Sequence, residues 1–152
     1  MTKTMLAITR DAYCAPEQLQ LRHIPVPAIG ADDVLVRVEA AGVDQGAWHL
    51  VTGLPYVVRA ASGLRRPKNP VPGMDVAGLV EAVGANVTRF RPGDEVYGTC
   101  DGSYAAYARA HQDKLAPKPT NLTFAEAAAV PISACAALHG LRDAGRLTAG
   151  QT

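Results

Sequence analysis

Short segments in which hydrophobic and polar residues alternate occupy about the first 115 residues. In the clearest of them, residues 33–40, valine occupies positions 34, 36 and 38, and Arg37 and Glu39 fall on the opposite face. Alternation with a period of two is typical of a strand with one face buried and one face exposed. The other segments of strand character are 5–8, 19–24, 75–83, 95–98 and 102–109.

Turn residues separate these segments. Eleven prolines and fourteen glycines divide the chain into short pieces. Residues 91–94, Arg-Pro-Gly-Asp, predict a tight turn in which glycine supplies the positive φ. Gly78 interrupts an apolar strand, which indicates a bulge or a bend. Many short strands with turns between them predict a small antiparallel barrel rather than alternating strands and helices.

The pattern changes from strands to helices at Asn121. Asn121 or Thr123 is expected to cap a helix, and Glu126 follows Thr123 at the spacing of a capping box. Pro131 interrupts this helix, and residues 133–144 predict a second one. We therefore expect a mainly β fold that ends in short helices.

Composition and charge indicate an ordinary globular chain. Hydrophobic residues make up 48% of the 152 residues, charged residues make up 19%, and the net charge is +1. The one basic cluster, residues 65–68, is short, so we expect a solvated loop and no nucleic-acid partner. No segment resembles a signal peptide or a membrane span, so we also expect no membrane partner.

The three cysteines, Cys14, Cys100 and Cys135, are odd in number and far apart. This spacing argues against a disulfide framework and against a zinc site closed by cysteines. A cytoplasmic protein is the simplest interpretation. Cys135 lies in an alanine-rich helix, where we expect it to be buried and inert.

Residues that could bind a ligand or take part in a reaction lie in two segments of the chain. Asp44, Trp48 and His49 lie in a loop or short helix after the strand 33–40, and Met74-Asp75 follows a Pro-Gly turn. A histidine in such a loop is more often structural than catalytic, and the spacing of these acids and the histidine does not by itself indicate a metal site. Asp75 is expected to accept hydrogen bonds from backbone donors near the turn.

The order of four longer motifs is more specific. They are AAGVDQGAWHLVTG (40–53), NPVPGMDVAGLVEAVGANVTRFRPGDEVYG (69–98), GSYAAYARA (102–110) and KLAPKPTNLTFAEAAAVPISACAALHGL (114–141). Together they resemble the N-terminal GroES-like domain of the medium-chain dehydrogenase/reductases, in the zinc-free quinone oxidoreductase branch. The resemblance implies a partly open antiparallel β-barrel over residues 1–120. It also implies a helical segment, 121–152, that leads to a nucleotide-binding Rossmann domain absent from this chain.

The resemblance also implies the chemistry. Asp44, Met74 and Ile132 match the positions of the three zinc ligands in the zinc-dependent relatives, and none keeps the thiolate or imidazole of such a site. We therefore expect no zinc and an electron-poor substrate, such as a quinone or an α,β-unsaturated carbonyl compound. Hydride would come from NADPH or NADH.

Four residues are expected to meet the cofactor. His49 is expected to donate a proton or contact the cofactor, and Asp44 either hydrogen-bonds substrate or cofactor or caps the following turn. Ala136 stands where many relatives carry a threonine that reaches the nicotinamide, so Ser133 or Cys135 would have to compensate. Two further residues are expected to line the substrate cleft: Trp48 and Met74.

Two alternatives to the zinc-free reductase stay open. The chain has no glycine-rich phosphate loop, so it is either one domain of a larger enzyme or a self-contained barrel that serves as a binding or assembly module. A conventional alcohol dehydrogenase is the third interpretation. The resemblance makes the nucleotide-binding domain of the same full-length protein the expected partner, with a homodimer of that protein also expected.

Overall fold

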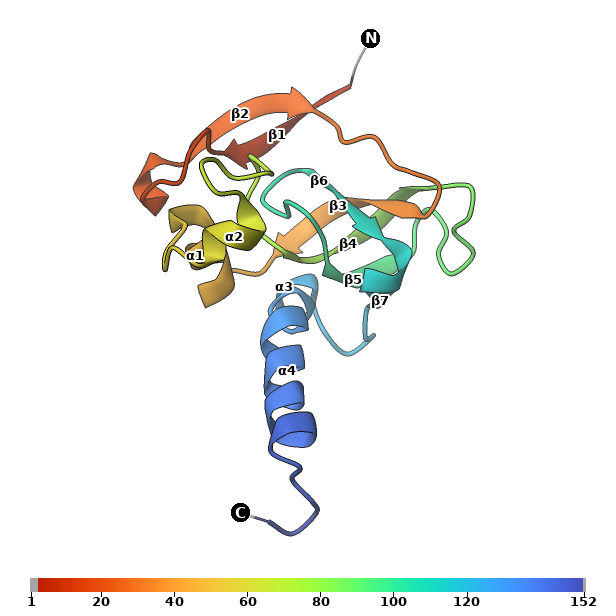
Figure 1. Ribbon diagram of the computed structural model, residues 1–152. Helices are drawn as coiled ribbons and strands as arrows, with labels where there is room; N and C mark the ends of the chain where they lie inside the picture. The colour runs from red at the N-terminus through yellow and green to blue at the C-terminus, as the bar shows by residue number, and fades with distance from the viewer. Residues whose placement is uncertain (1–2, 152) are drawn as a thin grey trace.

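The computed structural model describes residues 3–151 as short strands followed by short helices (Figure 1). The strands are β1 (Thr4–Thr9), β2 (Gln20–Pro25), β3 (Asp33–Ala41), β4 (Asp75–Val83), β5 (Glu95–Thr99), β6 (Tyr107–His111) and β7 (Leu115–Pro117). The helices are α1 (Gln45–Thr52), α2 (Val58–Ser62), α3 (Phe124–Ala128) and α4 (Pro131–Leu138), with shorter turns η1 (Pro16–Gln18) and η2 (Gln112–Lys114) and a π-helical turn η3 (His139–Ala144).

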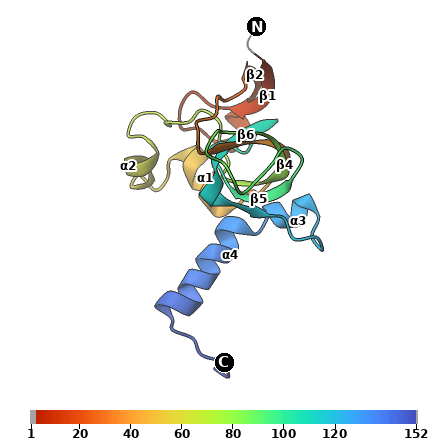
Figure 2. The same ribbon diagram turned by 90° about the vertical axis from the view of Figure 1, so that its right-hand side faces the viewer.

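The strands form two antiparallel sheets. A five-stranded sheet has the order β6-β3-β4-β5-β7, and β1 pairs with β2 in a separate two-stranded sheet. Figure 2 shows the larger sheet curling around its own interior. The expectation of a mainly β, partly open antiparallel fold is confirmed. No helix among the described residues is long and apolar enough to cross a membrane.

The core lies inside the curled sheet and consists mostly of valine. Val34 and Val36 on β3, Val76 on β4 and Val96 on β5 are all fully buried. Burial alternates along the first half of β3 and along β5, so their β-branched side chains point to one face. The predicted alternation along residues 33–40 is therefore confirmed.

The irregularity expected at Gly78 lies opposite it, in the partner strand. Val38 pairs with Gly78 and Ala40 pairs with Ala77, so Glu39 is the extra residue of a bulge in β3. A Cβ atom on Gly78 would strike the carbonyl oxygen of Arg37. Glycine is therefore needed here because the two backbones approach closely.

The strand expected at residues 102–109 begins only at Tyr107. Gly102 has a φ of 90°, which turns the chain away from an extended strand. The segment then bonds to β1, with Ile8 N–H donating to the Tyr104 carbonyl at 2.8 Å and Ala106 N–H donating to the Leu6 carbonyl at 2.9 Å. These bonds join the two sheets, and they replace the expected strand.

Capping residues and a proline mark the starts of α3 and α4. Thr123 caps α3 with its side chain, and the Glu126 carboxylate accepts from the Thr123 N–H at 2.8 Å, as the predicted capping box requires. Pro131 separates α3 from α4 as expected, but it is the first residue of α4, which therefore begins two residues before Ser133. Thr152, the end of the predicted helical segment, lies outside the described residues.

Candidate functional site

Helix α1 is fixed at both ends by its own sequence. The Asp44 carboxylate accepts a hydrogen bond from the Ala47 N–H at 2.7 Å, and Gly53 ends the helix with a φ of 64°. These are the usual N-cap and C-cap devices of a short helix. Asp44 therefore caps α1, as one of its two expected roles requires.

The Pro-Gly turn places Met74 beside Asp44. Gly73 has a φ of 91°, and a Cβ there would strike the Ser103 hydroxyl and the Tyr104 ring. On the other side, a Cβ built on Gly46 would lie 3.3 Å from the Met74 methyl carbon and 3.2 Å from a carboxylate oxygen of Asp44. The Met74 and Asp44 side chains therefore reach the same space next to Gly46.

Asp75 joins β4 to the start of α4. Its side chain is only 2% exposed, and its Oδ1 accepts from the Ile132 N–H at 3.2 Å. Burial raises the pKa of Asp75 to about 6, the Ile132 hydrogen bond opposes this, and the charge of Asp44 adds to it. Asp75 therefore accepts from a backbone donor, as expected, but this donor lies on α4 and not in the turn.

The contacts bring together the three positions that the resemblance matched to zinc ligands. Asp44 and Met74 meet across Gly46, and Asp75, next to Met74, bonds to Ile132. Their side chains offer one carboxylate, one thioether and one alkyl group. Within residues 3–151, no three side chains of His, Cys, Asp or Glu lie close enough to hold a metal ion.

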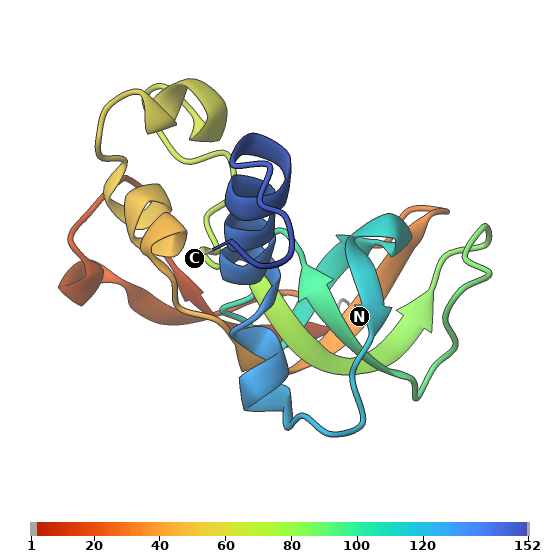
Figure 3. The same ribbon diagram turned by 90° about the horizontal axis from the view of Figure 1, so that it is seen from below.

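A cavity of about 480 Å³ opens beside Met74. Its walls come from α1 and α2, which lie together at one side of the larger sheet (Figures 1 and 3), and from the loops around Gly73 and Gly102. The lining is mostly apolar, with Leu50 and Val71 among its residues, and a few polar side chains interrupt it. This size and this mixture are typical of a site for a small organic ligand.

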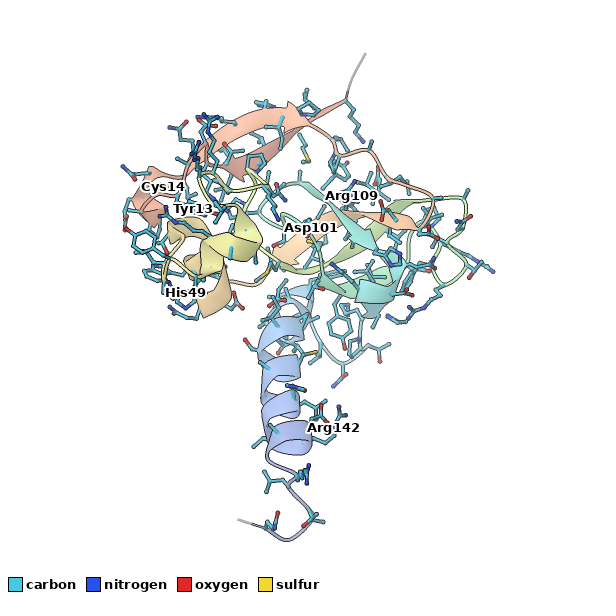
Figure 4. The ribbon with its side chains drawn as sticks, in the orientation of Figure 1. Tyr13, Cys14, His49, Asp101, Arg109 and Arg142 are labelled. Carbon is cyan, nitrogen blue, oxygen red and sulfur yellow. The ribbon has the colours of Figure 1, made fainter. Side chains whose placement is uncertain are left out.

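His49 lies outside this cavity, whose lining includes its neighbour Leu50. The Nδ1 of His49 is 2.6 Å from the Leu54 carbonyl oxygen, and its ring packs edge-on against Trp48 with centroids 5.2 Å apart. Figure 4 shows His49 on α1, well separated from Asp101 at the cavity wall. Trp48 is 42% exposed, so it projects from α1 instead of packing inside the described domain.

Helix α4 projects from the sheets (Figures 1 and 2), and its side chains are exposed from Ser133 onward. Ser133 and Ala136 are both exposed, as are Leu138 at 51% and Leu141 at 56%. Cys135 is exposed too, so the expectation that it is buried is wrong. It is accessible because no described element covers this part of α4.

The cavity wall also contains Arg10, which the sequence patterns did not single out. Arg10 directly follows β1 and is only 6% exposed. The one sequence signal for it was that Arg10 lies just beyond the predicted strand 5–8. Its burial could not be predicted from the sequence, because arginine is rarely buried.

Comparison with known proteins identifies the fold family. The alcohol dehydrogenase GroES-like domain matches residues 30–139. The chain is 35% identical to quinone oxidoreductase of Mus musculus, covering 99% of this chain and 44% of that protein, and 36% identical to 2-methylene-furan-3-one reductase of Solanum lycopersicum, covering 93% and 38%. A mycobacterial structure complexed with NADPH superposes with a TM-score of 0.81 at 27% identity, covering 96% and 42%.

The chain thus spans less than half the length of the relatives it matches. The family match covers most of the sheet, the turn before Met74 and helix α4. The chain belongs to the alcohol dehydrogenase GroES-like domain family, in the quinone oxidoreductase branch of the medium-chain dehydrogenase/reductases.

Proposed function

We propose that this chain is the substrate-cleft domain of a zinc-independent, NAD(P)H-dependent oxidoreductase that reduces quinones, enones or similar carbonyl compounds. The observation that carries the proposal is the mostly apolar cavity beside Met74, whose side chain reaches the same space next to Gly46 as Asp44. The relatives named quinone oxidoreductase and 2-methylene-furan-3-one reductase support the same reaction class.

Zinc independence rests on the chemistry of the side chains. Asp44, Met74 and Ile132 do not fit a tetrahedral zinc, which takes thiolate, imidazole or carboxylate ligands from at least three residues in catalytic sites. A site without a Lewis acid favours substrates whose carbonyl already withdraws electrons, and hydrogen-bond donors then stabilise the developing oxyanion. Quinones and enones have this property.

Exposed side chains on α4 are available to a nicotinamide cofactor. Ser133 and Ala136 lie on the uncovered α4, and we propose that this surface contacts the cofactor together with Asp44 and His49. When bound, the reduced nicotinamide supplies the hydride. The mycobacterial neighbour complexed with NADPH supports this cofactor class.

The chain's own residues would orient the substrate and move a proton. Apolar side chains such as Leu50 and Val71 would hold the substrate body and exclude water. In His49, the Nδ1–H donates to the Leu54 carbonyl, so Nε2 is the atom left to exchange a proton. Asp44 would act mainly through α1, because its carboxylate is already engaged by Ala47.

The other residues that bind the cofactor would come from a nucleotide-binding domain of the same full-length protein. The uncovered α4, with Leu138 and Leu141 exposed, is the surface that this domain would cover. The relatives, which are more than twice as long as the matched region, support this proposal. A homodimer of the full-length protein and a cytoplasmic location stay predictions.

The test begins with the intact mass of the polypeptide in its native source, and then measures NADPH and NADH oxidation by that protein with quinone and enone acceptors. We expect a product about twice this length, turnover that a chelator does not change, and little turnover by the 152-residue chain alone. Stoichiometric zinc that a chelator removes together with activity would instead identify a conventional alcohol dehydrogenase. A native product of 152 residues without turnover would favour the binding or assembly module.

A further inference from the structure

The guanidinium of Arg10 is a buried charge that has no partner within residues 3–151. Its Nε and Nη1 atoms are inaccessible and have no hydrogen-bond partner among the described residues. No carboxylate in residues 3–151 forms an ion pair with it. Burying an uncompensated charge destabilises a protein by several kcal/mol, so such groups are rare unless they serve a ligand or a reaction.

Arg22 provides the contrast on the same side of the molecule. Its Nη2 lies 2.9 Å from the Asp11 carboxylate, and both side chains of this pair are exposed. Asp11 is the residue next to Arg10, yet its carboxylate pairs with Arg22 instead. The acid nearest to Arg10 in sequence is therefore engaged elsewhere, and Arg10 keeps its donors free.

The backbone holds Arg10 against the loop that forms the cavity. The Arg10 N–H donates to the Pro70 carbonyl at 2.9 Å, and Pro70 directly precedes the turn of residues 71–74. Arg10 lines the cavity of about 480 Å³ together with Met74 and the apolar residues Leu50, Val58 and Val71. The cavity thus combines a mostly apolar wall with one buried cationic donor.

The other charged side chains at this cavity do not neutralise Arg10. Lys68 and Asp101 line the same space, and both are exposed. Burial lowers the pKa of the Arg10 guanidinium, but arginine stays protonated at neutral pH. The cavity wall therefore offers a permanent positive charge to a ligand.

We propose that Arg10 binds an anionic carboxylate, so that the cavity accepts carbonyl compounds with an apolar body and a carboxylate end. A guanidinium matches a carboxylate in both charge and geometry, and a hydrogen bond between charged groups strengthens away from water. The inference rests on the proposed function only in taking this cavity as the substrate site. It adds a specificity determinant, Arg10, and a substrate class.

The test compares binding of 4-oxo-octanoate and its methyl ester to the 152-residue chain by titration calorimetry. Both probes are saturated, so the cysteine thiols do not add to them, and binding needs neither cofactor nor hydride. We expect the acid to bind about ten- to a hundredfold more tightly than the ester. Arg10→Met should abolish this preference, whereas Arg22→Met should keep it.

Stability measurements test whether a variant loses binding only because it is unfolded. Replacing a buried unpaired charge by an apolar side chain of similar length is neutral or stabilising, so the melting temperature of Arg10→Met should equal or exceed that of the unchanged chain. Arg10→Lys keeps the charge without the planar fork, and it should retain part of the acid preference. Equal binding of acid and ester to the unchanged chain would overturn the proposal.

A second pair of variants locates the carboxylate. Arg10 also lines a smaller pocket of about 280 Å³ next to Ala12, Tyr13 and Cys14. Ala61→Phe would fill the larger cavity and should remove acid binding, whereas Ala12→Phe would fill the smaller pocket and should not. The opposite result would contradict the proposed site. Because these outcomes do not involve hydride transfer, failure of the reductase proposal would leave them unchanged.

Discussion

Strand β4 and helix α4 have similarly apolar sequences and opposite surroundings. Along β4, Val76 and Val80 are buried at 0% and 3% exposure, whereas every residue of the chain from Ser133 to Gly150 is exposed. The strand is buried because β3 and β5 flank it and the sheet curls over its inner face. Among the described residues, no element packs over α4 from Ser133 onward. Apolar sequence therefore leads to burial only where the chain itself supplies the covering element.

Replacing a leucine by alanine in each of the two regions should give the largest difference in the free energy of unfolding. Leu115 is 2% exposed within the valine core, and Leu138 is 51% exposed on α4. We expect Leu115→Ala to lower the free energy of unfolding by about 2–5 kcal/mol, because it leaves a cavity in packed surroundings. Leu138→Ala should change it by less than about 0.5 kcal/mol. Chemical denaturation of the 152-residue chain measures both.

Equal losses of stability in the two variants would contradict the contrast between core and helix. In the full-length protein, Leu138→Ala should become destabilising if another domain covers α4. That measurement therefore also tests the proposed partner domain independently of any activity assay.

Asp75 joins the two regions through its hydrogen bond to Ile132, and its burial should make stability depend on pH. The folded-state pKa of Asp75, about 6, lies above its unfolded value, so the folded protein holds this proton to higher pH. This group's favourable contribution is complete below about pH 4 and is lost as the pH rises through about 6. Asp75→Asn keeps an acceptor for Ile132, and it should raise the free energy of unfolding at pH 7 by up to about 3 kcal/mol.

Thermal or chemical unfolding between pH 4 and pH 8 checks this expectation. The difference between the unchanged chain and Asp75→Asn should grow with pH and level off above about pH 7. Two curves that stay parallel throughout this range would show that Asp75 does not titrate there.

The smallest expected effect concerns the cap of α1. Asp44→Ala removes the acceptor for the Ala47 N–H, and we expect a loss of about 1 kcal/mol in the free energy of unfolding. Asp44→Asn should retain nearly all the stability, because asparagine caps as well as aspartate. If Asp44→Asn nevertheless weakens turnover of the full-length protein, the charge acts in the site as well as in the cap. If both variants unfold like the unchanged chain, the cap contributes nothing measurable.

Local patterns predicted most of the fold. The alternating valines of residues 33–40, the turn at residues 91–94 and the capping box at Thr123 each depend on neighbours within a few residues. Such signals survive in any tertiary setting, because they follow from the period of the backbone and from local hydrogen bonds. Two short elements, α2 and β7, were not predicted, because five and three residues are too few to show a period.

The sequence by itself determined the mainly β architecture, the turns and caps, and the absence of a thiolate or imidazole at the matched positions Asp44, Met74 and Ile132. Only the tertiary structure decided that Asp75 bonds to Ile132, that Cys135 is exposed, and that Arg10 lies at a cavity wall with no partner in the described part of the chain. The physical reason is the separation along the chain over which each interaction acts. Periodicity and capping act over a few residues, whereas burial and charge pairing depend on segments that the fold brings together from distant parts of the chain.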